Sequence, residues 1–310
     1  MNSQFVASQA PGVQARIISL SEHTAHALED WVARYPAIRK VRVWPVALSV
    51  VAAAPHSTLD AAVAVARLGL WIFALDDVFD EEQLPERELM RRADRYQAIA
   101  LGHSAAPAGD ALAAALNEIR EELAGFALFE PLSEDWTTSL CRTIQGMIRE
   151  YGWRQQHLSE DASGLPSYQE YVENGLYSIG IPPHDWASVI TTGDSSAVDC
   201  RPHLHAMDRI AGTCIRLAND LRSYKKELAE GNVNSLLILA HAFQHQGLDA
   251  SQAHLRAKAQ VRADIVRGLD SLAKLQAGGG TMTGNPERGI ADIARFCCEF
   301  YVAHDYHTLT

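Results

Sequence analysis

Apolar and polar positions along this chain repeat mostly with the period of an α-helix. Residues 58–79, TLDAAVAVARLGLWIFALDDVF, are apolar on nearly all sides, which predicts a helix buried in the middle of a bundle. Residues 88–102 and 109–126 instead carry charge on one face and aliphatic side chains on the other, which predicts peripheral helices. Almost no segment shows the two-residue alternation of a strand. The pattern therefore predicts an all-α fold.

Short polar breaks rich in Gly, Pro and Ser separate the predicted helices. They fall at residues 102–110, 157–167, 181–186 and 276–289. None is long enough to act as a linker between domains, and no internal repeat is visible. We expect a single helical domain over residues 16–310, with roughly ten or more helices, and an N-terminal segment, residues 1–15, without fixed structure.

Composition narrows the class of protein. The 310 residues are 47% hydrophobic, and 27 basic against 38 acidic residues give a net charge of −11, which argues against a nucleic-acid partner. Five cysteines form no CxxC pair, so we expect free thiols in a reducing compartment, the cytoplasm. No basic start with an apolar run and no stretch of about 18 apolar residues occurs, so we expect neither a signal peptide nor a membrane span.

The buried helix ends in a dense group of carboxylates, DDVFDEE. Asp76 and Asp80 are four residues apart and share a helical face, whereas Asp77 lies about 100° from both. Carboxylates late in a helix face the negative end of its dipole, which is unfavourable unless a cation compensates them. Mg²⁺ prefers such oxygen ligands together with substrate phosphates. The alternative is a solvated acidic helix end.

A second polar row lies in RIAGTCIRLANDLRSYKKELAEGNVNS. Asn219, Ser223 and Glu227 follow one another at intervals of four residues, which stacks an amide, a hydroxyl and a carboxylate along one stripe. Arg216 and Lys226 place cationic groups beside this stripe. Oxygen ligands next to cations suit a metal-bound diphosphate, although an ordinary amphipathic helix with polar contacts remains the alternative.

Together, DDVFD at 76–80 and NDLRSYKKE at 219–227 resemble the aspartate-rich and Asn/Ser/Glu motifs of class I terpene synthases. SYQEYVENGLYSIGIPPH is similar to the broken helix of the bacterial kaurene-synthase-like diterpene synthases, and MIREYGW resembles a pocket-lining helix of this family, with Met147, Glu150 and Trp153 at three-residue spacing. No DxDD motif of the class II cyclases occurs. The resemblance covers nearly the whole chain and implies the all-α class I terpene synthase bundle.

The resemblance also implies a reaction, in which three Mg²⁺ ions help to ionise a prenyl diphosphate. It assigns Asp76 and Asp80 to one ligand group, with Asp77 beside them, and the row of Asn219, Ser223 and Glu227 to another ion. Arg216 and Lys226 become expected diphosphate contacts. The break at Gly180, which Pro182 and Pro183 enforce, is expected to free backbone carbonyls that assist ionisation, and Tyr177, Ser178 and Ile179 are expected to contact substrate beside it.

A carbocation needs apolar and aromatic walls that exclude water. For each candidate side chain, a place in the ordinary core is the alternative to a place in the pocket wall. The candidates are Trp71, Phe73, Phe79, Trp153, Tyr177 and Trp186.

Two departures from the family pattern affect diphosphate recognition. Glu173 occupies the position where many microbial relatives carry an arginine diphosphate sensor, and the usual Arg-Tyr pair near the C-terminus reads Asp305-Tyr306, which leaves Tyr306 as the expected contact. These departures favour the kaurene-synthase-like branch and a C20 substrate. That substrate would be linear geranylgeranyl diphosphate or a bicyclic copalyl-type diphosphate made by a separate class II cyclase. Family analogy also suggests a homodimer.

Other functions stay open on the sequence alone. A sesquiterpene synthase acting on farnesyl diphosphate, a prenyl chain-elongating transferase and a non-catalytic helical interaction protein are the alternatives. Elongating enzymes usually carry a second aspartate-rich motif where this chain has NDLRSYKKE. The His-Leu-His sequence at 203–205 is expected in a surface loop rather than at a metal, and Cys297 and Cys298 are expected in the core.

Overall fold

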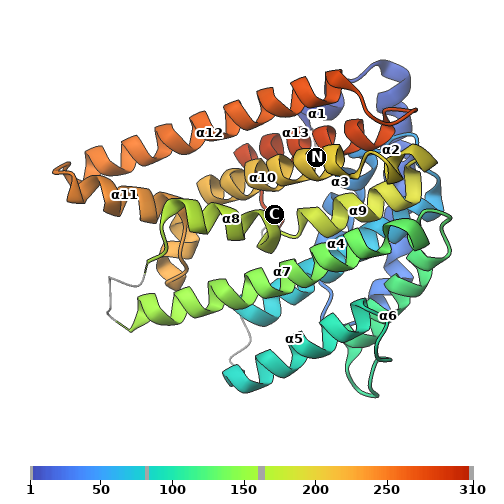
Figure 1. The fold of residues 1–310 in the computed structure, drawn as a ribbon, viewed down its shortest axis with the longest axis horizontal. Coiled ribbons are helices and arrows are strands. Elements are labelled where there is room, and N and C mark those ends of the chain that lie inside the picture. The colour runs from blue at the N-terminus through green and yellow to red at the C-terminus, as the bar shows by residue number, and fades with distance from the viewer. Residues whose placement is uncertain (1–2, 81–83, 160–164, 307–310) are drawn as a thin grey trace.

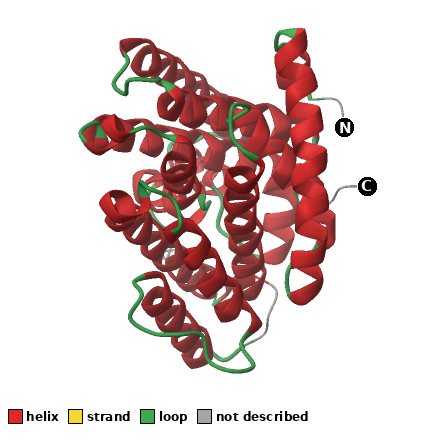
Figure 2. Cartoon of the chain, turned by 90° about the vertical axis from the view of Figure 1, so that its right-hand side faces the viewer, coloured by secondary structure: helices red, strands yellow, loops and turns green. Residues whose placement is uncertain are grey.

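The structure is a computed structural model that describes residues 3–80, 84–159 and 165–306, without the side chain of Asp80. Every regular element in these ranges is helical, as Figure 2 shows, so the all-α prediction is confirmed for this part of the chain. The helices are α1 (Gln4–Ala7), α2 (Pro11–Arg34), η1 (Lys40–Arg42), α3 (Val43–Ala53), α4 (Leu59–Asp80), α5 (Glu86–Ala100), α6 (Ala111–Ala124), α7 (Phe129–Leu158), α8 (Tyr168–Ser178), α9 (Ile181–Thr192), η3 (Ser195–Val198), α10 (Arg201–Glu230), α11 (Ser235–His245), α12 (Ala250–Gly278) and α13 (Asn285–Ala303).

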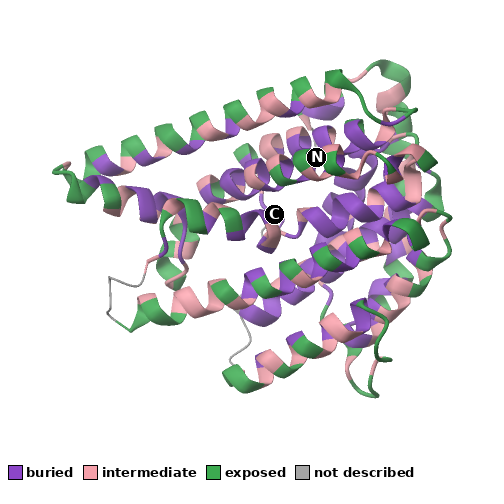
Figure 3. Ribbon diagram, in the orientation of Figure 1, coloured by how far each residue is buried: buried purple, intermediate pink, exposed green. Residues whose placement is uncertain are grey.

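Helix α4 lies inside the bundle, as its all-round apolar sequence predicts. It packs against α2, α3, α6, α7 and α9, and Leu68, Trp71 and Leu75 have no exposed surface. The amphipathic helices α5 and α6 lie at the edge of the bundle opposite α12, with exposed residues along their outer faces (Figures 1 and 3). Burial of apolar surface on both sides of α4 is thus the main source of its stability.

Helices α8 and α9 follow one another with a break at Ile179 and Gly180 (Figure 1). Gly180 has φ of 78°, a left-handed conformation that a residue with a Cβ rarely adopts. The next two residues after Ile181 are prolines, which fit the first turn of α9 because its N–H groups have no helical acceptor. Residues 181–186 were expected to form a break, but the helix already begins at Ile181.

Two further expectations differ from the structure. The N-terminal segment is helical from Gln4: Phe5 packs edge-on against Phe296 at 5.9 Å, and its N–H donates to Glu299 Oε1 at 2.7 Å. The His-Leu-His sequence lies in the first turns of α10 and not in a loop. Within the described part of the chain, no helix is both long and apolar enough to cross a membrane.

Candidate active site

A cavity opens between α3, α4, α7, the α8–α9 break, α10 and α13. Helix α4 contributes one face to this cavity, and Asp76 lies on that face. The α4 residues in the wall are Gly69, Ile72, Phe73, Asp76 and Phe79. Intervals of three and four residues are those of a single helical stripe, so the apolar positions before Asp76 and the carboxylate itself face the same space. Asp80 is expected on this stripe, but its side chain lies outside the described residues.

Asp77 has a different environment from its neighbour. Its carboxylate forms a bidentate ion pair with the buried Arg42, with N–O distances of 2.7 and 2.8 Å, and Arg39 approaches Oδ2 at 3.2 Å. It is not among the described residues that line the cavity. Its offset of about 100° from Asp76 turns it toward η1, so the structure places Asp77 in an ion pair outside the described cavity wall.

Asn219, Ser223 and Glu227 all line the cavity from α10, as one stripe. Ser223 Oγ donates to the carbonyl of Asn219 at 2.9 Å, and Glu227 Oε2 accepts from Asn234 Nδ2 at 2.7 Å. Burial raises the pKa of Glu227 to about 7, and the nearby carboxylate of Asp220 adds to this rise while Arg216 opposes it. Hydrogen bonds from Asn234 and Ser223 favour the charged form of this half-buried acid, and added positive charge would favour it further.

Arg216 reaches the cavity wall but is held by groups of the protein. Its guanidinium lies 3.3 Å from Glu150 Oε2 and 3.1 Å from Asp220 Oδ1, and it donates to the hydroxyl of Tyr171 at 3.0 Å. Helix α8 comes close enough for these contacts because Gly175 lacks a Cβ, which would lie 2.8 Å from Arg216 Cγ. The positive charge of Arg216, which was expected to contact a diphosphate, is thus already paired with acidic groups of the protein.

The helix break lies in the same wall. Ser178, Ile179 and Gly180 line the cavity, and Ser178 Oγ donates to Glu150 Oε1 at 2.5 Å. The prolines at 182 and 183 have no N–H to give to the carbonyls of Ser178 and Ile179, four residues earlier. Tyr177 is placed elsewhere: its hydroxyl accepts from Arg142 at 2.6 Å and from Arg209 at 3.1 Å, and it is not among the lining residues.

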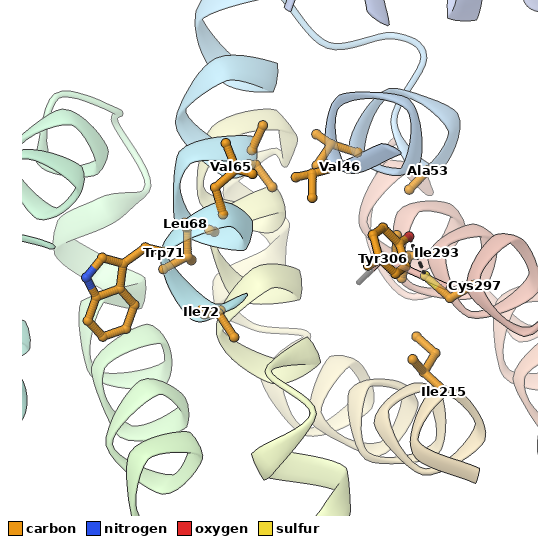
Figure 4. Packing of buried hydrophobic residues seen from close by; sticks show 14 of the residues in the cluster. Val46, Ala53, Val65, Leu68, Trp71, Ile72, Ile215, Ile293, Cys297 and Tyr306 are labelled. Carbon is orange, nitrogen blue, oxygen red and sulfur yellow. Dashed lines mark hydrogen bonds between the residues drawn. The ribbon is translucent and has the colours of Figure 1, made fainter. Parts of the chain in front are cut away.

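The aromatic candidates divide into two groups. Phe73, Phe79 and Tyr306 line the cavity, and the Tyr306 ring lies 5.0 Å from that of Phe73. The three tryptophans are not among its lining residues. Figure 4 shows Trp71 directed away from Ile72 and Ile215, and its Nε1 donates to the carbonyl of Leu112 at 2.8 Å.

The other two tryptophans pack against aromatic rings elsewhere. Trp153 packs on Tyr171 with ring centroids 6.1 Å apart, and Trp186 packs on His205 at 4.5 Å. The structure therefore places Trp71, Trp153, Trp186 and Tyr177 outside the described wall of this cavity.

Several lining residues were missed from the sequence, among them Arg154, His184 and Tyr301. Arg154 follows Glu150 by four residues and Met147 by seven, so the helical stripe through MIREYGW pointed to it. Together with Lys226 it brings positive charge to the cavity from a second helix. Glu173 is exposed and paired with Gln169, so it lies outside this wall.

The donor set of the cavity suits a hard divalent cation. Asp76, Asn219, Ser223 and Glu227 offer carboxylate, amide and hydroxyl oxygens, the ligand types that Mg²⁺ prefers. In the described residues no three His, Cys, Asp or Glu side chains gather as metal ligands do, because only Glu227 in the α10 row is acidic. Oxygen donors of this kind are typical of Mg²⁺ that keeps water and phosphate ligands.

The chain is similar to plant terpene synthases. It is 26% identical over 223 residues to chloroplastic ent-kaur-16-ene synthase of Oryza sativa subsp. japonica, over 69% of this chain and 28% of that protein. It is 29% identical over 108 residues to ent-pimara-8(14),15-diene synthase of the same plant, over 34% of this chain and 12% of that protein. The two matches thus span 28% and 12% of the length of these curated relatives.

Solved structures show the same fold at low identity. One is 2-methylisoborneol synthase from Streptomyces coelicolor in complex with Mg²⁺ and geranyl-S-thiolodiphosphate, with a TM-score of 0.74, 20% identity and coverage of 95% of this chain and 93% of that one. Another is a protein obtained by ancestral sequence reconstruction, with a TM-score of 0.73, 19% identity and coverage of 93% and 86%. Residues 67–266 match the model of terpene synthase family 2, C-terminal metal binding, and the chain belongs to this family.

Proposed function

We propose that this protein is a Mg²⁺-dependent class I diterpene synthase, which ionises a C20 prenyl diphosphate, directs the carbocation to a cyclised or rearranged hydrocarbon and releases diphosphate. One observation carries the proposal: the polar groups of α4 and α10 line the same cavity, together with apolar residues. These groups are Asp76 on α4 and the row of Asn219, Ser223 and Glu227 on α10. Family membership adds independent support.

Different residues of the cavity wall would bind the metal and the diphosphate. Asp76, with Asp80, would hold Mg²⁺ from α4, and the row of Asn219, Ser223 and Glu227 would hold it from α10. Three bound Mg²⁺ ions would neutralise the charge that develops on the diphosphate as the C–O bond breaks. Lys226 and Arg154 would contact the diphosphate itself, because they line the cavity beside these rows.

Farther from the metal ligands, the wall would protect the carbocation. Ile72, Phe73 and Ile215 exclude water and offer an aromatic face, and the carbonyls of Ser178 and Ile179 would direct partial negative charge to the reacting carbon. Arg216 fixes the relative positions of α7, α8 and α10 through Glu150, Tyr171 and Asp220.

The names of the relatives support a C20 substrate, since ent-kaurene-type and pimaradiene-type synthases are among them. A copalyl-type diphosphate fits this relationship and would be supplied by a separate class II cyclase. Geranylgeranyl diphosphate is the linear alternative.

The direct test is incubation with Mg²⁺ and farnesyl, geranylgeranyl or copalyl diphosphate of each stereochemistry. Released diphosphate and extracted products are measured together. We expect release and a diterpene from a C20 substrate. Turnover of farnesyl diphosphate alone would make the protein a sesquiterpene synthase, longer diphosphates would make it an elongating transferase, and no release from any substrate would overturn the proposal.

A further inference from the structure

A buried histidine lies in the cavity wall away from the metal-binding rows. His184 is 8% exposed and follows Ile181 by one turn of α9, so both line the cavity from the same helical face. Its ring is the one imidazole among the described lining residues, where the other nitrogen side chains are two arginines, a lysine and two amides. Burial lowers the pKa of His184 to about 4, which leaves the ring neutral at physiological pH.

The neighbours of His184 in the cavity wall include residues of α13. Burial raises the pKa of Tyr301, to which the negative charge of Asp76 also contributes, so Tyr301 lies near the metal-binding end. Cys297 precedes it by four residues, about 6 Å along the helix axis. Burial raises the pKa of Cys297 to about 12, and the carboxylate of Asp185 adds to this rise. Helix α9 packs against α13, and His184 lines the cavity together with Cys297 and Tyr301.

Behind His184 lies a pair of buried acids. Asp185 and Asp208 are 2% and 3% exposed, and His184 Nδ1 lies 3.4 Å from Asp185 Oδ1. Burial raises the pKa of both carboxyl groups, and each forms a side-chain hydrogen bond with the other. As two carboxylates, they would leave Asp185 Oδ2 and Asp208 Oδ1 buried without a donor among the described residues. One proton shared between them would satisfy both oxygens, and the pair would then carry a single negative charge beside the imidazole.

Asp185 is not needed as a helix cap. The N-cap of α9 is Gly180, without a side-chain hydrogen bond, so Asp185 at the fifth helical position does not cap the helix. Replacement of a buried acid pair by apolar side chains is often neutral or stabilising in proteins. A neutral imidazole open to an apolar cavity, with a negative charge behind it, is the arrangement that stabilises a proton arriving from the cavity.

We propose that His184 is the catalytic base that ends the reaction by taking a proton from the last carbocation, and that Asp185 and Asp208 position it. The inference rests on the proposed function. The C–H bond next to the cationic carbon breaks, its electron pair becomes the new C=C bond, and the proton bonds to the imidazole. The resulting imidazolium is stabilised by the charge of the acid pair and returns its proton to water when the product leaves.

The test separates ionisation from termination. His184→Phe and His184→Ala are compared with the unmodified protein, on the substrate that it turns over, for the rate of diphosphate release and for product distribution. We expect release within about threefold of the unmodified rate, because the metal-binding rows are intact. The original alkene should fall to less than about a tenth of the products, replaced by alkenes deprotonated elsewhere or by alcohols from water capture.

Further variants distinguish a base from a packing residue. Added imidazole should restore the original alkene in His184→Ala but not in His184→Phe, whose ring fills the site. Asp185→Asn should shift the products in the same direction as His184→Ala, also at an unchanged rate of diphosphate release. His254→Phe is the matched control: this histidine of α12 lies outside the cavity wall, with its ring 4.8 Å from that of Tyr224, and its replacement should leave the products unchanged.

Three results would overturn the inference: the original product distribution in the His184 variants, a parallel loss of diphosphate release, or no response of His184→Ala to imidazole. If His184→Phe does not fold, His184→Ala and Asp185→Asn decide the question. Absence of diphosphate release by the unmodified protein would instead overturn the proposed function, so the two failures are distinguishable.

Discussion

At the scale of single residues, the neighbouring aspartates at the end of α4 lie in different environments. Asp76 lines the cavity, whereas Asp77 is bound by Arg42, which is 1% exposed and also donates to the carbonyl of Phe73 at 3.0 Å. The Arg42 guanidinium lies 5.1 Å from the ring centroid of Phe73. The ion pair therefore fixes the end of the helix that presents Asp76, without using Asp76 itself.

Loss of Arg42 should destabilise the fold strongly. Arg42→Met leaves Asp77 in a poorly hydrated place with only the half-exposed Arg39 beside it, so we expect the free energy of unfolding to fall by about 3 kcal/mol. Urea denaturation measures this change. Arg91→Met is the control, since the Arg91–Glu88 pair is largely exposed on α5 and its loss should change stability by less than about 0.5 kcal/mol. Equal effects of the two substitutions would contradict the structural role of Arg42.

The ligands on α10 should affect turnover far more than folding. Asn219→Ala and Glu227→Ala each remove an oxygen from the expected Mg²⁺ site, so we expect diphosphate release to fall by about 100-fold or more. The melting temperature should change by only a few degrees, as both side chains line a cavity. Arg222→Ala changes an exposed position on the same helix and should retain full activity. Full activity in either ligand variant would remove that residue from the site.

At the scale of elements, the α8–α9 break depends on a glycine. A Cβ at Gly180 would lie 2.4 Å from Ile72 Cγ2, and φ of 78° would be strained for alanine as well. We expect Gly180→Ala to lower the free energy of unfolding by about 2 kcal/mol and to reduce turnover, because the clash displaces two cavity walls at once. Stability is measured by urea denaturation and turnover by diphosphate release.

Gly152 provides the matched control for Gly180. It lies inside α7, and a Cβ there would meet nothing within 4 Å. Gly152→Ala should therefore raise the free energy of unfolding by roughly 0.5–1 kcal/mol, through the higher helix propensity of alanine. Destabilisation at Gly152 equal to that at Gly180 would show that the conformation and contacts of Gly180 are not the cause.

Asp194 joins the segment after α9 to the segment before α13. It accepts hydrogen bonds from the N–H of Ser196 at 3.0 Å and from the N–H and Oγ1 of Thr283 at 3.0 and 2.6 Å. Burial disfavours its charged form, but these hydrogen bonds outweigh that effect and lower the pKa of Asp194 to about 2. Since the folded-state pKa is depressed, the stabilisation is complete above the unfolded pKa of about 4 and is lost as the pH falls toward 2.

Asp194→Asn should reveal this pH dependence. At pH 7 we expect the variant to be less stable by at most about 1 kcal/mol, because solvent screens this partly exposed carboxylate. The difference between the two proteins should shrink between pH 4 and pH 2, where the native carboxylate also becomes protonated. Urea denaturation across this range measures it, and a difference that stays constant down to pH 2 would exclude the carboxylate as its source.

The sequence predicts the elements better than it predicts which side chains face the cavity, and α4 shows why. Because this helix is apolar all round, Trp71 and Phe73 were equally plausible wall residues. Asp76 fixes the phase: Ile72 and Phe73 precede it by four and three residues, whereas Trp71 precedes it by five and faces α6. The partners of Asp77 and His184 come from η1, α9 and α10, so only the tertiary arrangement reveals them.

At the scale of the whole molecule, the negative charge of the protein makes diphosphate binding depend on Mg²⁺. The protein carries a net charge of −11, and the described cavity wall contains five acidic side chains against three cationic ones. Arg216, one of the three, is already paired with Glu150 and Asp220. A highly charged diphosphate should thus be repelled until Mg²⁺ is present. We expect the metal and the anion to bind cooperatively, with each weak alone.

Thermal denaturation can test this coupling without any turnover. Inorganic diphosphate and Mg²⁺ together, at about 100 times their dissociation constants, should stabilise the fold by about 2.7 kcal/mol, which corresponds to a rise in melting temperature of about 5 °C for a chain of this size. Diphosphate alone should give little change, and a chelator should abolish the rise. Glu227→Ala, which removes the half-buried acid whose charged form added positive charge would favour, should fold normally but lose the response. An equal rise with diphosphate alone would show that the protein's own cations suffice and that the two polar rows do not bind the metal.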